Sequence, residues 1–375
     1  MRIGLHPLWL DSDPHGGIAT YWTALIENLG RLDSNNNYVV YYTHPTAAAR
    51  GQSYRPPHFA ARVLKPASLW LEIPFSLPFD LLRSPVELLH VQMLAPPLCP
   101  VPFVQTINDI AWETNPEVFP ASVRLRLKLL VPGSARRARR IITVSEYSKG
   151  LICERYGIAP ERVVVTPHGV TPGYRPVTDA DTLAAVRQRY GLERPFLLHV
   201  GKLQARKNLV RLVQAFRRGV VDAGLPHVLA LVGPRTWTAE DIFRAIEEEQ
   251  VQDRVIIVGE VPLDDLPTLY SAADLFVFPS LAEGFGLPPL EAMTCGTAVV
   301  SSSASSLPEV VGDAGVLIDP YDVDALAEAM AEVLRDDSLR ASLVQRGLAR
   351  ATLFSNENMT RLTLEAYAAV RAEIA

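Results

Sequence analysis

Short apolar runs alternate with helix-like stretches throughout the second half of this chain of 375 residues. Five runs have the composition of buried strands: 196–200, 227–232, 255–258, 274–278 and 298–301. Helix-like patterns separate them at 209–221, 239–249, 264–272 and 289–293. Continuous apolar strands are typical of a parallel sheet covered on both faces, and their alternation with helices indicates βαβ units. The second half is therefore predicted to be a doubly wound α/β domain.

The first half shows the same elements less regularly. Strands are predicted at 3–6, 39–42, 88–91, 104–106, 141–144 and 163–166, and a helix at 18–31. Glycine and proline cluster between Pro172 and Pro176, before a helical pattern at 179–190. A chain of this length usually forms two domains. We therefore expect Rossmann-like domains at 1–174 and 175–356, and we interpret the proline-rich region from 56 to 120 as loops.

Composition argues against several classes of protein. A net charge of −5 and a pI near 5.9 do not suit a protein that binds nucleic acid through bulk positive charge. Cys99, Cys153 and Cys295 lack metal-ligand spacing, and an odd number of cysteines favours a reducing cytosol. The first residues resemble a strand and not a signal peptide, and prolines interrupt the apolar stretch 67–79. We expect a cytoplasmic globular protein without a membrane span.

The segment from Glu283 to Glu291 is the strongest indication of a binding site. Seven residues separate its two carboxylates, and they include two glycines and two prolines. Glu283 follows the predicted strand 274–278, and Glu291 lies on the helix that comes next. Open α/β sheets bind ligands at the carboxyl ends of their strands, and the free amides at a helix start favour phosphate. An anionic ligand is therefore expected here.

This segment resembles the donor-site signature of the retaining glycosyltransferases of family four, which have the GT-B fold. Four other segments are similar to motifs of that family, in the same order: 16–21, 143–148, 165–170 and 200–209. The resemblance extends from about residue 1 to residue 372. It implies two Rossmann-like domains with a donor/acceptor cleft between them, and a last helix, 357–372, that crosses back onto the first domain. It also implies transfer of a sugar from a nucleotide diphosphate to an acceptor.

The resemblance also implies roles for the donor side. Arg206 and Lys207 would bind the donor pyrophosphate, with help from Lys202, and fixed cations there stabilise the leaving diphosphate. Glu291 would accept hydrogen bonds from the two ribose hydroxyls, because a carboxylate offers two acceptor oxygens. Each assignment has an alternative. For the basic pair it is a solvated loop, and for Glu291 it is an acid near a helix start that complements the helix dipole.

Glu283 would contact the hydroxyls of the donor sugar. The resemblance implies that the amides of Phe285, Gly286 and Leu287 assist it. The base pocket would be lined, largely through backbone, by 233–235 and 259–262, including Val261, together with Leu266. Backbone contacts leave the choice of base unreadable from the sequence.

The amino-terminal half would supply the acceptor side. Gly16 and Gly17 would allow close approach of the backbone to the donor phosphate, although a simple tight turn is the alternative. Asn108 and Asp109 occupy the place where the family usually has His-Asp. Asn108 is thus a departure, because an amide forms hydrogen bonds but cannot act as a base. Asp109, Asn108 and Glu283 are our candidate catalytic residues. Ser145 is either a helix cap or a ligand contact.

No metal or cofactor is expected. Asp11 and Asp13 have the Asp-x-Asp form of a different glycosyltransferase fold, but they lie in a polar loop, and the Arg206–Lys207 pair already supplies positive charge. The basic run from 124 to 140 has no acid in it and is broken at Pro132. It is therefore not expected to form one amphipathic helix. A solvated helix face is the favoured interpretation, and peripheral contact with a membrane face is the other.

Taken with the resemblance, the sequence predicts a metal-independent retaining glycosyltransferase of surface polysaccharide synthesis. The wider resemblance is to the bacterial mannosyltransferase-like branch of the family, so GDP-mannose is the first expected donor, followed by UDP-glucose and dTDP-rhamnose. The acceptor would be a glycan or a lipid-linked compound. The resemblance implies front-face attack, with the departing phosphate helping to take the acceptor's proton, since no carboxylate nucleophile is evident. Two alternatives stay open. One is a nucleotide-sugar epimerase on the same scaffold. The other is a non-catalytic nucleotide-sugar binding protein, which Asn108 allows because an asparagine stands where the family usually has a histidine.

Overall fold

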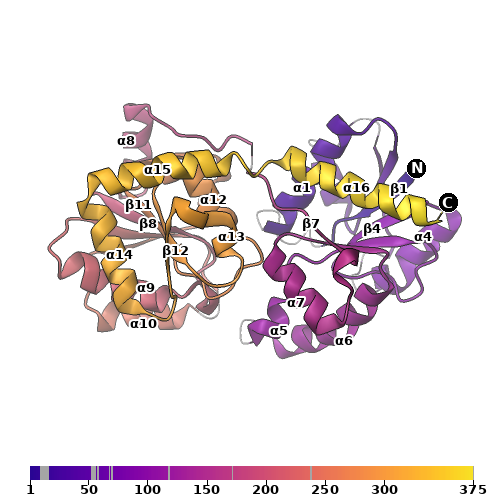
Figure 1. Ribbon diagram of the computed structural model, residues 1–375, viewed down its shortest axis with the longest axis horizontal. Helices are drawn as coiled ribbons and strands as arrows, with labels where there is room; N and C mark the ends of the chain where they lie inside the picture. Colours follow the sequence, from indigo (N-terminus) through magenta and orange to yellow (C-terminus); the bar gives the residue numbers. More distant parts are fainter. Residues whose placement is uncertain are drawn as a thin grey trace. The chain divides into compact units, whose positions relative to one another are not determined.

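In the computed structural model the chain forms two compact α/β units (Figure 1). The structure describes residues 1–8, 17–51, 56, 59–66, 68, 71–116, 119–170, 172–236 and 239–374. Unit 1 consists of Met1–Gly169 and Ser355–Ala375, and unit 2 of Val170–Phe354. The structure thus divides the chain after Gly169 and after Phe354, whereas the sequence placed these divisions after 174 and 356.

Unit 1 is built on a parallel sheet of seven strands in the order β3-β2-β1-β4-β5-β6-β7. The strands are β1 Arg2–His6, β2 Asn37–Tyr42, β3 Ala60–Val63, β4 Leu88–Gln92, β5 Phe103–Thr106, β6 Arg140–Thr143 and β7 Val163–Val165. Side chains alternate between the faces, so that Val40 packs in one core and Val39 in the other. Both faces of the sheet are therefore buried.

Helices cover the two faces of this sheet. The core on one face includes residues of α1 Gly17–Leu32 and α16 Asn356–Ile374, which lie side by side in Figure 1. The other core includes residues of α4 Leu77–Arg83, α6 Ala121–Arg137 and α7 Glu146–Tyr156. The remaining helical elements are α2 Pro45–Gly51, the π-helix Glu72–Ser76, α5 Ala111–Thr114 and the 3₁₀ turn Pro160–Arg162. The last segment of the chain thus completes the first unit.

Unit 2 has a parallel sheet of six strands in the order β10-β9-β8-β11-β12-β13. They are β8 Phe196–Val200, β9 Val228–Val232, β10 Val255–Gly259, β11 Leu275–Phe278, β12 Val299–Ser302 and β13 Val316–Ile318. The α-helices are α8 Ala180–Arg189, α9 Leu209–Phe216, α10 Glu240–Glu248, α11 Leu266–Ala272, α12 Leu287–Thr294, α13 Leu307–Val311, α14 Val323–Arg335 and α15 Asp337–Ala351. A π-helical segment, Arg217–Val221, continues α9.

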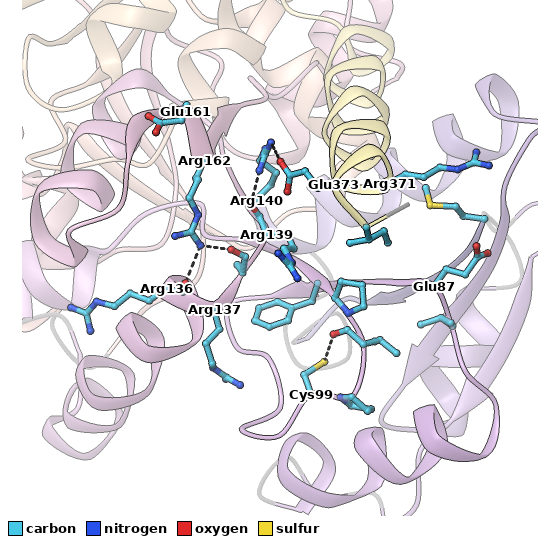
Figure 2. A pocket seen from close by; sticks show the side chains of 18 residues that line it. Glu87, Cys99, Arg136, Arg137, Arg139, Arg140, Glu161, Arg162, Arg371 and Glu373 are labelled. Atoms are coloured by element: carbon cyan, nitrogen blue, oxygen red, sulfur yellow. Dashed lines mark hydrogen bonds and ion pairs between the residues drawn. The ribbon is translucent and has the colours of Figure 1, made fainter.

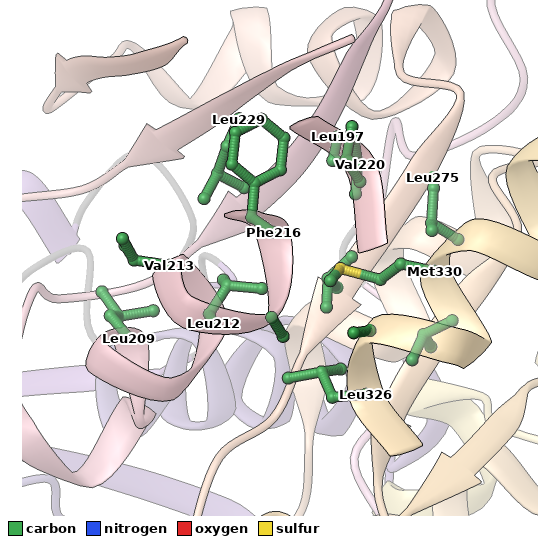
Figure 3. Close-up of a cluster of buried hydrophobic side chains, with 14 of the residues drawn as sticks. Leu197, Leu209, Leu212, Val213, Phe216, Val220, Leu229, Leu275, Leu326 and Met330 are labelled. Carbon is green, nitrogen blue, oxygen red and sulfur yellow. The ribbon is translucent and has the colours of Figure 1, made fainter. Parts of the chain in front are cut away.

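The core on one side of the second sheet is dominated by aliphatic side chains (Figure 3). Phe216 of α9 and Met330 of α14 are completely buried there with Leu229 and Leu275 of the sheet. Burying side chains of this size stabilises the fold by about 1.5–3 kcal/mol each. The core therefore holds the strand ends of this unit in fixed positions.

The strand orders locate the binding region of each unit. In both sheets the order reverses between the first and fourth strands of the unit, which are β1 and β4 in unit 1 and β8 and β11 in unit 2. Loops leaving such a pair diverge and form a crevice outside the carboxyl ends of the strands. The loops after β8 and β11 are therefore the expected ligand-binding region of unit 2.

The predicted doubly wound sheets are confirmed, with most strand bounds within a residue or two. Two short strands, β3 and β13, were missed, because three or four residues give little periodicity. The interpretation of 56–120 as loops is wrong in part, since a π-helix and α4 occupy 72–83. Pro78 lies in the first turn of α4, where its missing N–H costs no hydrogen bond.

The break expected at Pro132 is also wrong, because α6 runs through this residue. The basic run 124–140 nevertheless extends beyond one helix, since α6 ends at Arg137 and Arg140 begins β6. The buried residues of α6, among them Leu127 and Val131, pack on the sheet and keep the helix continuous. Its outer face exposes Leu125 and Leu129 among the basic residues. Among the described residues, no helix has the length and apolar character needed to cross a membrane.

Candidate functional site

The loop after β8 presents Arg206 and Lys207. The chain leaves β8 at Val200 and makes a 3₁₀ turn over Ala205–Lys207. Asn208 then adopts a left-handed conformation with φ of 61°, and its Nδ2 donates to the carbonyls of Pro279 (3.1 Å) and Pro320 (2.6 Å). These bonds tie the loop after β8 to the end of β11. The basic pair is therefore held at the point where the strand order reverses.

Glu283 joins this basic pair. Lys207 Nζ donates to Glu283 Oε1 at 2.6 Å, and Arg206 Nη1 donates to Glu283 Oε2 at 3.1 Å. Lys207 also lies over the ring of Phe278, 4.6 Å from its centre. The side chains of Lys207 and Glu283 are only 8% and 10% exposed, so this is an enclosed ion-pair cluster and not a solvated loop.

Electrostatics keep Glu283 ionised. Burial opposes the charged form, but Arg206, Lys207 and a hydrogen bond from Ser280 outweigh it and lower the pKa of Glu283 to about 2. One carboxylate faces two cations, so the cluster keeps a formal charge of +1. It can therefore attract an anion of higher charge, such as a diphosphate.

Three serines position Glu283, and sequence reasoning missed all of them. Ser280 Oγ donates to Glu283 Oε1 at 2.6 Å. The Glu283 amide donates to Ser305 Oγ at 2.9 Å, and Ser306 Oγ donates to the Glu283 carbonyl at 2.9 Å. The only sequence signal is the serine-rich run 301–306. These bonds fix both the backbone and the carboxylate of Glu283.

Glu291 lies on α12, one turn beyond its start, and is partly exposed. Its Oε2 accepts a hydrogen bond from the Tyr270 hydroxyl at 2.9 Å. Desolvation by the surrounding protein raises the pKa of Glu291 to about 7, although the Tyr270 bond acts in the opposite direction. The first turn of α12 contains no acid, so the helix-dipole interpretation of Glu291 is not supported. No cation is paired with this carboxylate in the described part of the chain.

The segment between the two glutamates turns sharply into α12. Gly286 has φ of 121°, and a Cβ there would lie 2.8 Å from Leu307 Cδ2, so glycine is required. Phe285 is buried with its ring edge against Phe354. In the described residues, the amides of Gly286 and Leu287 donate to no acceptor in the protein. These amides can serve an anionic or hydroxyl-rich ligand.

The remaining predicted donor residues lie at the same edge of the sheet. Lys202 is exposed in the loop after β8. Val261 follows β10 and is half-buried, and Leu266 begins α11 with 8% exposure. Arg235, after β9, lies over the ring of Phe243 at 3.9 Å. All of them thus follow the carboxyl ends of β8, β9 and β10, at the edge of the sheet where Arg206 and Glu283 follow β8 and β11.

Unit 1 carries the predicted acceptor-side residues at the carboxyl ends of its own strands. Asn108 follows β5, and its Oδ1 accepts from Gln92 Nε2 at 3.1 Å. Gln92 in turn accepts from Trp22 Nε1 at 2.8 Å. Asp109 Oδ1 accepts at 3.0 Å from the amide of Ala111, the first residue of the short helix α5. The structure thus holds Asn108 in one orientation through Gln92, a residue that the sequence did not indicate.

Gly17 is the exposed first residue of α1, whereas Gly16 lies outside the described residues. A buried pair that the sequence did not indicate lies nearby in the fold: His6 Nε2, at the end of β1, is 2.6 Å from Glu72 Oε1. Ser145 caps α7, because its side chain accepts from the amide of Ser148 at 3.1 Å. This agrees with the first of its two interpretations, a helix cap.

The described residues contain no group of three or more side chains arranged to hold a metal ion. Asp11 and Asp13 lie outside those residues. His199 and His168 are buried, and desolvation lowers the pKa of His199 to about 3 and that of His168 to about 4. Both imidazoles are therefore neutral near pH 7.

Comparison with known proteins agrees with this arrangement. The model of "Glycosyl transferases group 1" matches residues 185–350, and that of "Glycosyltransferase Family 4" matches residues 15–174. O-antigen chain mannosyltransferase B of Escherichia coli is 39% identical over 265 residues, which are 70% of this chain and 69% of that protein. The serotype-specific mannosyltransferase WbdA of the same species is 34% identical over 62% of this chain, but the match spans only 29% of WbdA.

The fold is shared more widely. Sucrose-phosphate synthase from Thermosynechococcus elongatus superposes with a TM-score of 0.76 over the whole of both chains, at 22% identity. Two Rossmann-like domains of the GT-B type are therefore established for this protein. Taken with the two family models and the Escherichia coli relative, the structure shows that the chain belongs to the glycosyltransferases of group 1 and family 4.

Proposed function

We propose that this glycosyltransferase transfers mannose from GDP-mannose, without a metal ion and with retention of the anomeric configuration. The ion-pair cluster of Arg206, Lys207 and Glu283 carries the proposal. It lies where the strand order of unit 2 reverses, and its two cations are fixed before any ligand arrives. Preorganised cations stabilise charge that develops on a leaving group without reorganisation.

Arg206 and Lys207 are assigned to the donor pyrophosphate. In the ligand-free cluster Glu283 occupies part of their hydrogen-bonding capacity. A pyrophosphate carries more charge than one carboxylate, so it competes for the same cations. Glu283 then turns from a partner of the cations to an acceptor for hydroxyls of the sugar. The two cations take the place of the divalent metal used by other glycosyltransferase folds.

Glu291 is assigned to the ribose. Its second carboxylate oxygen, Oε1, has no partner among the described residues, whereas Oε2 holds the Tyr270 hydroxyl. The amides of Gly286 and Leu287, at the start of the same helix, supply donors for the phosphate or the sugar. The half-buried Val261 and the first turn of α11 are assigned to the base.

The proposed reaction is a front-face substitution at the anomeric carbon. The bond between the anomeric carbon and the diphosphate oxygen breaks, the acceptor oxygen bonds to the same face of that carbon, and the acceptor proton passes to the departing phosphate. Glu283 is not a nucleophile in this scheme, because its carboxylate is assigned to the hydroxyls of the donor sugar, with Ser280 donating to Oε1. Asn108 positions a substrate through its amide and takes no proton.

The names of the relatives support surface polysaccharide synthesis, with a glycan or lipid-linked acceptor. Peripheral contact with an anionic membrane is part of the proposal. On α6 the exposed Leu125 and Leu129 lie among Arg124, Arg126 and Lys128, which suits a surface that offers both lipid tails and negative headgroups.

The test combines a binding panel with product analysis. GDP-mannose and GDP should raise the melting temperature more than UDP-glucose or dTDP-rhamnose at equal concentration. Proton NMR of the product formed on a simple alkyl mannoside should show the α-anomer, the configuration of the donor. A β-linked product would contradict retention. Conversion of the nucleotide sugar to its epimer, or binding without transfer or hydrolysis, would favour one of the two alternatives instead.

A further inference from the structure

Unit 1 contains an open cavity at the edge of its sheet that faces away from the proposed acceptor side. Residues that immediately precede strands line it, among them Glu87 before β4, Pro102 before β5, Arg139 before β6 and Arg162 before β7. Since all strands are parallel, these residues lie at the amino ends, opposite Asn108 at the carboxyl end of β5. The cavity is therefore separate from the glycosyltransferase site of this unit.

Arginine dominates the lining. The cavity has a volume of about 1230 Å³, and Figure 2 shows its side chains. Six arginines line it, namely Arg136, Arg137, Arg139, Arg140, Arg162 and Arg371, against three glutamates, Glu87, Glu161 and Glu373. The formal side-chain charge is thus +3 in a protein whose net charge is −5. The carboxyl ends of α6 and α16 contribute about −0.5 each, which leaves a clear excess of positive charge.

Most of this charge is not neutralised inside the protein. Of the six arginines, only Arg140 forms an ion pair with a carboxylate in the described residues, that of Glu373. Arg137 donates to the carbonyls of Pro96 and Pro97, and Arg162 donates to the carbonyl of Arg136 at 2.9 Å. Bonds to neutral carbonyls hold these guanidinium groups in place but leave their charge uncompensated.

Two of the arginines have no internal role. Neither Arg139 nor Arg371 donates a side-chain hydrogen bond or forms an ion pair within the described residues, and both are exposed. In Figure 2 the side chains of Arg139 and Arg140 lie near the middle of the view with Arg162 to their left, whereas Arg371 lies at the right. Fixed and free guanidinium groups thus share one concave surface.

The geometry points to a second ligand site in this protein, a cavity that binds a multiply charged phosphate compound. Guanidinium groups match phosphate oxygens in pairs, and groups already held by carbonyls lose little side-chain entropy on binding. The cavity exceeds the size of a single phosphate, and Val101, Phe103 and Ile374 supply apolar walls for an attached organic part. The phosphates belong either to a soluble compound or to a lipid headgroup.

Calorimetry with inorganic tripolyphosphate tests the site. The titration uses the full chain with Lys207→Ala, which removes a main cation of the donor site, so that binding there contributes little. Adding Arg139→Gln and Arg371→Gln should weaken tripolyphosphate binding at least about tenfold, because two charge-assisted contacts are lost. Neither substitution breaks an internal contact, so an unchanged melting temperature verifies the fold.

Lys149→Gln with Arg155→Gln is the matched control, since it removes the same charge from α7, outside the cavity. Its affinity should stay within about twofold of the reference. Glu373→Gln should have the opposite effect and tighten binding, because it releases Arg140. The proposal is overturned if the Lys207→Ala chain does not bind tripolyphosphate, if the Arg139/Arg371 variant binds as well as the reference, or if both double variants weaken equally.

Vesicles separate the two sources of phosphate. Co-sedimentation is measured with phosphatidylcholine alone and with added phosphatidylglycerol. Vesicle binding that falls in the Arg139/Arg371 variant and not in the control assigns the phosphate to a headgroup. Vesicle binding that is equal in the two variants, together with weaker tripolyphosphate binding in the first, assigns it to a soluble compound. Either result supports the site.

Discussion

Lys207 and Glu283 form an enclosed ion pair, with Nζ 2.6 Å from Oε1 and neither side chain more than 10% exposed. The two residues come from loops that follow adjacent parallel strands, β8 and β11. A donor diphosphate would compete with Glu283 for the same ammonium group. The pair thus links the stability of the ligand-free protein to the strength of donor binding.

Lys207→Met should weaken GDP binding at least about tenfold, because a charge-assisted contact to the pyrophosphate is lost. It should also lower the free energy of unfolding by about 1–3 kcal/mol, since Glu283 keeps only Arg206 as a cationic partner. Combining it with Glu283→Gln should restore much of the stability but not the GDP affinity. Urea unfolding and calorimetry measure the two quantities, with Lys149→Met as control. Unchanged GDP affinity in Lys207→Met would remove the pyrophosphate assignment.

Transferase activity should survive chelation of divalent metals. In the proposed function Arg206 and Lys207 supply the positive charge at the leaving group, so EDTA should change the initial rate by less than about twofold. The assay compares EDTA-treated protein with and without added magnesium or manganese. A complete loss of activity that either metal restores would point to a metal site, with Asp11 and Asp13 as the first residues to test.

The two glutamates should make opposite contributions to stability as the pH changes. The pKa of Glu291 is raised to about 7, so the folded protein binds a proton that the unfolded chain releases near pH 4.5. Its contribution is therefore present at low pH and is lost as the pH rises toward 7, by at most about 3 kcal/mol. Glu283, with a pKa of about 2, stabilises above pH 4.5 and loses this contribution in acid.

Glu291→Gln should stabilise the protein at pH 8, where the wild-type carboxyl is charged and desolvated. It should have little effect at pH 5, where that carboxyl is protonated in the folded protein. Differential scanning calorimetry of the wild type and the variant at the two pH values measures this difference. Equal shifts in melting temperature at pH 5 and pH 8 would show that Glu291 titrates as an ordinary exposed carboxyl.

Asn108→Ala should reduce turnover by about tenfold or more, in line with the loss of a positioning hydrogen bond in the transition state. GDP affinity should stay the same, because the diphosphate and ribose contacts are assigned to unit 2. Steady-state kinetics and GDP calorimetry on the same preparation separate these effects. If turnover is unaffected, Asn108 has no part in the reaction and the departure from the family's histidine carries no functional meaning.

Periodicity predicted the fold well where the strands are long and buried. The run 196–200 agrees with β8 at both ends, and the alternation with helices in unit 2 is confirmed. It failed where proline was given too much weight. Pro132 lies inside α6, and Pro78 lies in the first turn of α4. Tertiary packing of Leu127 and Val131 outweighs the local cost of Pro132, and a single sequence does not reveal that packing. Pro78 needs no such compensation, because it stands in the first turn of its helix.

The site was only partly accessible from the sequence. Motifs identified Arg206, Lys207 and Glu283, but not that Glu283 would be paired with both cations before a donor arrives. Partners without a motif come from other strands, since Ser305 follows β12 and binds the amide of Glu283. Likewise, Gln92 ends β4 and binds Asn108, which follows the neighbouring strand β5. Such contacts depend on the order of the strands in the sheet, and the spacing of motifs along the chain does not predict that order.

The division of labour between the two glutamates is the central claim, and calorimetry of GDP binding at pH 8 tests it most directly. Glu291→Gln should weaken GDP at least about tenfold, because an ionised carboxylate no longer accepts the ribose hydroxyls. Glu283→Gln should leave GDP affinity unchanged or increase it, since it releases Arg206 and Lys207 for the pyrophosphate. Loss of GDP binding in Glu283→Gln as severe as in Glu291→Gln would contradict the account.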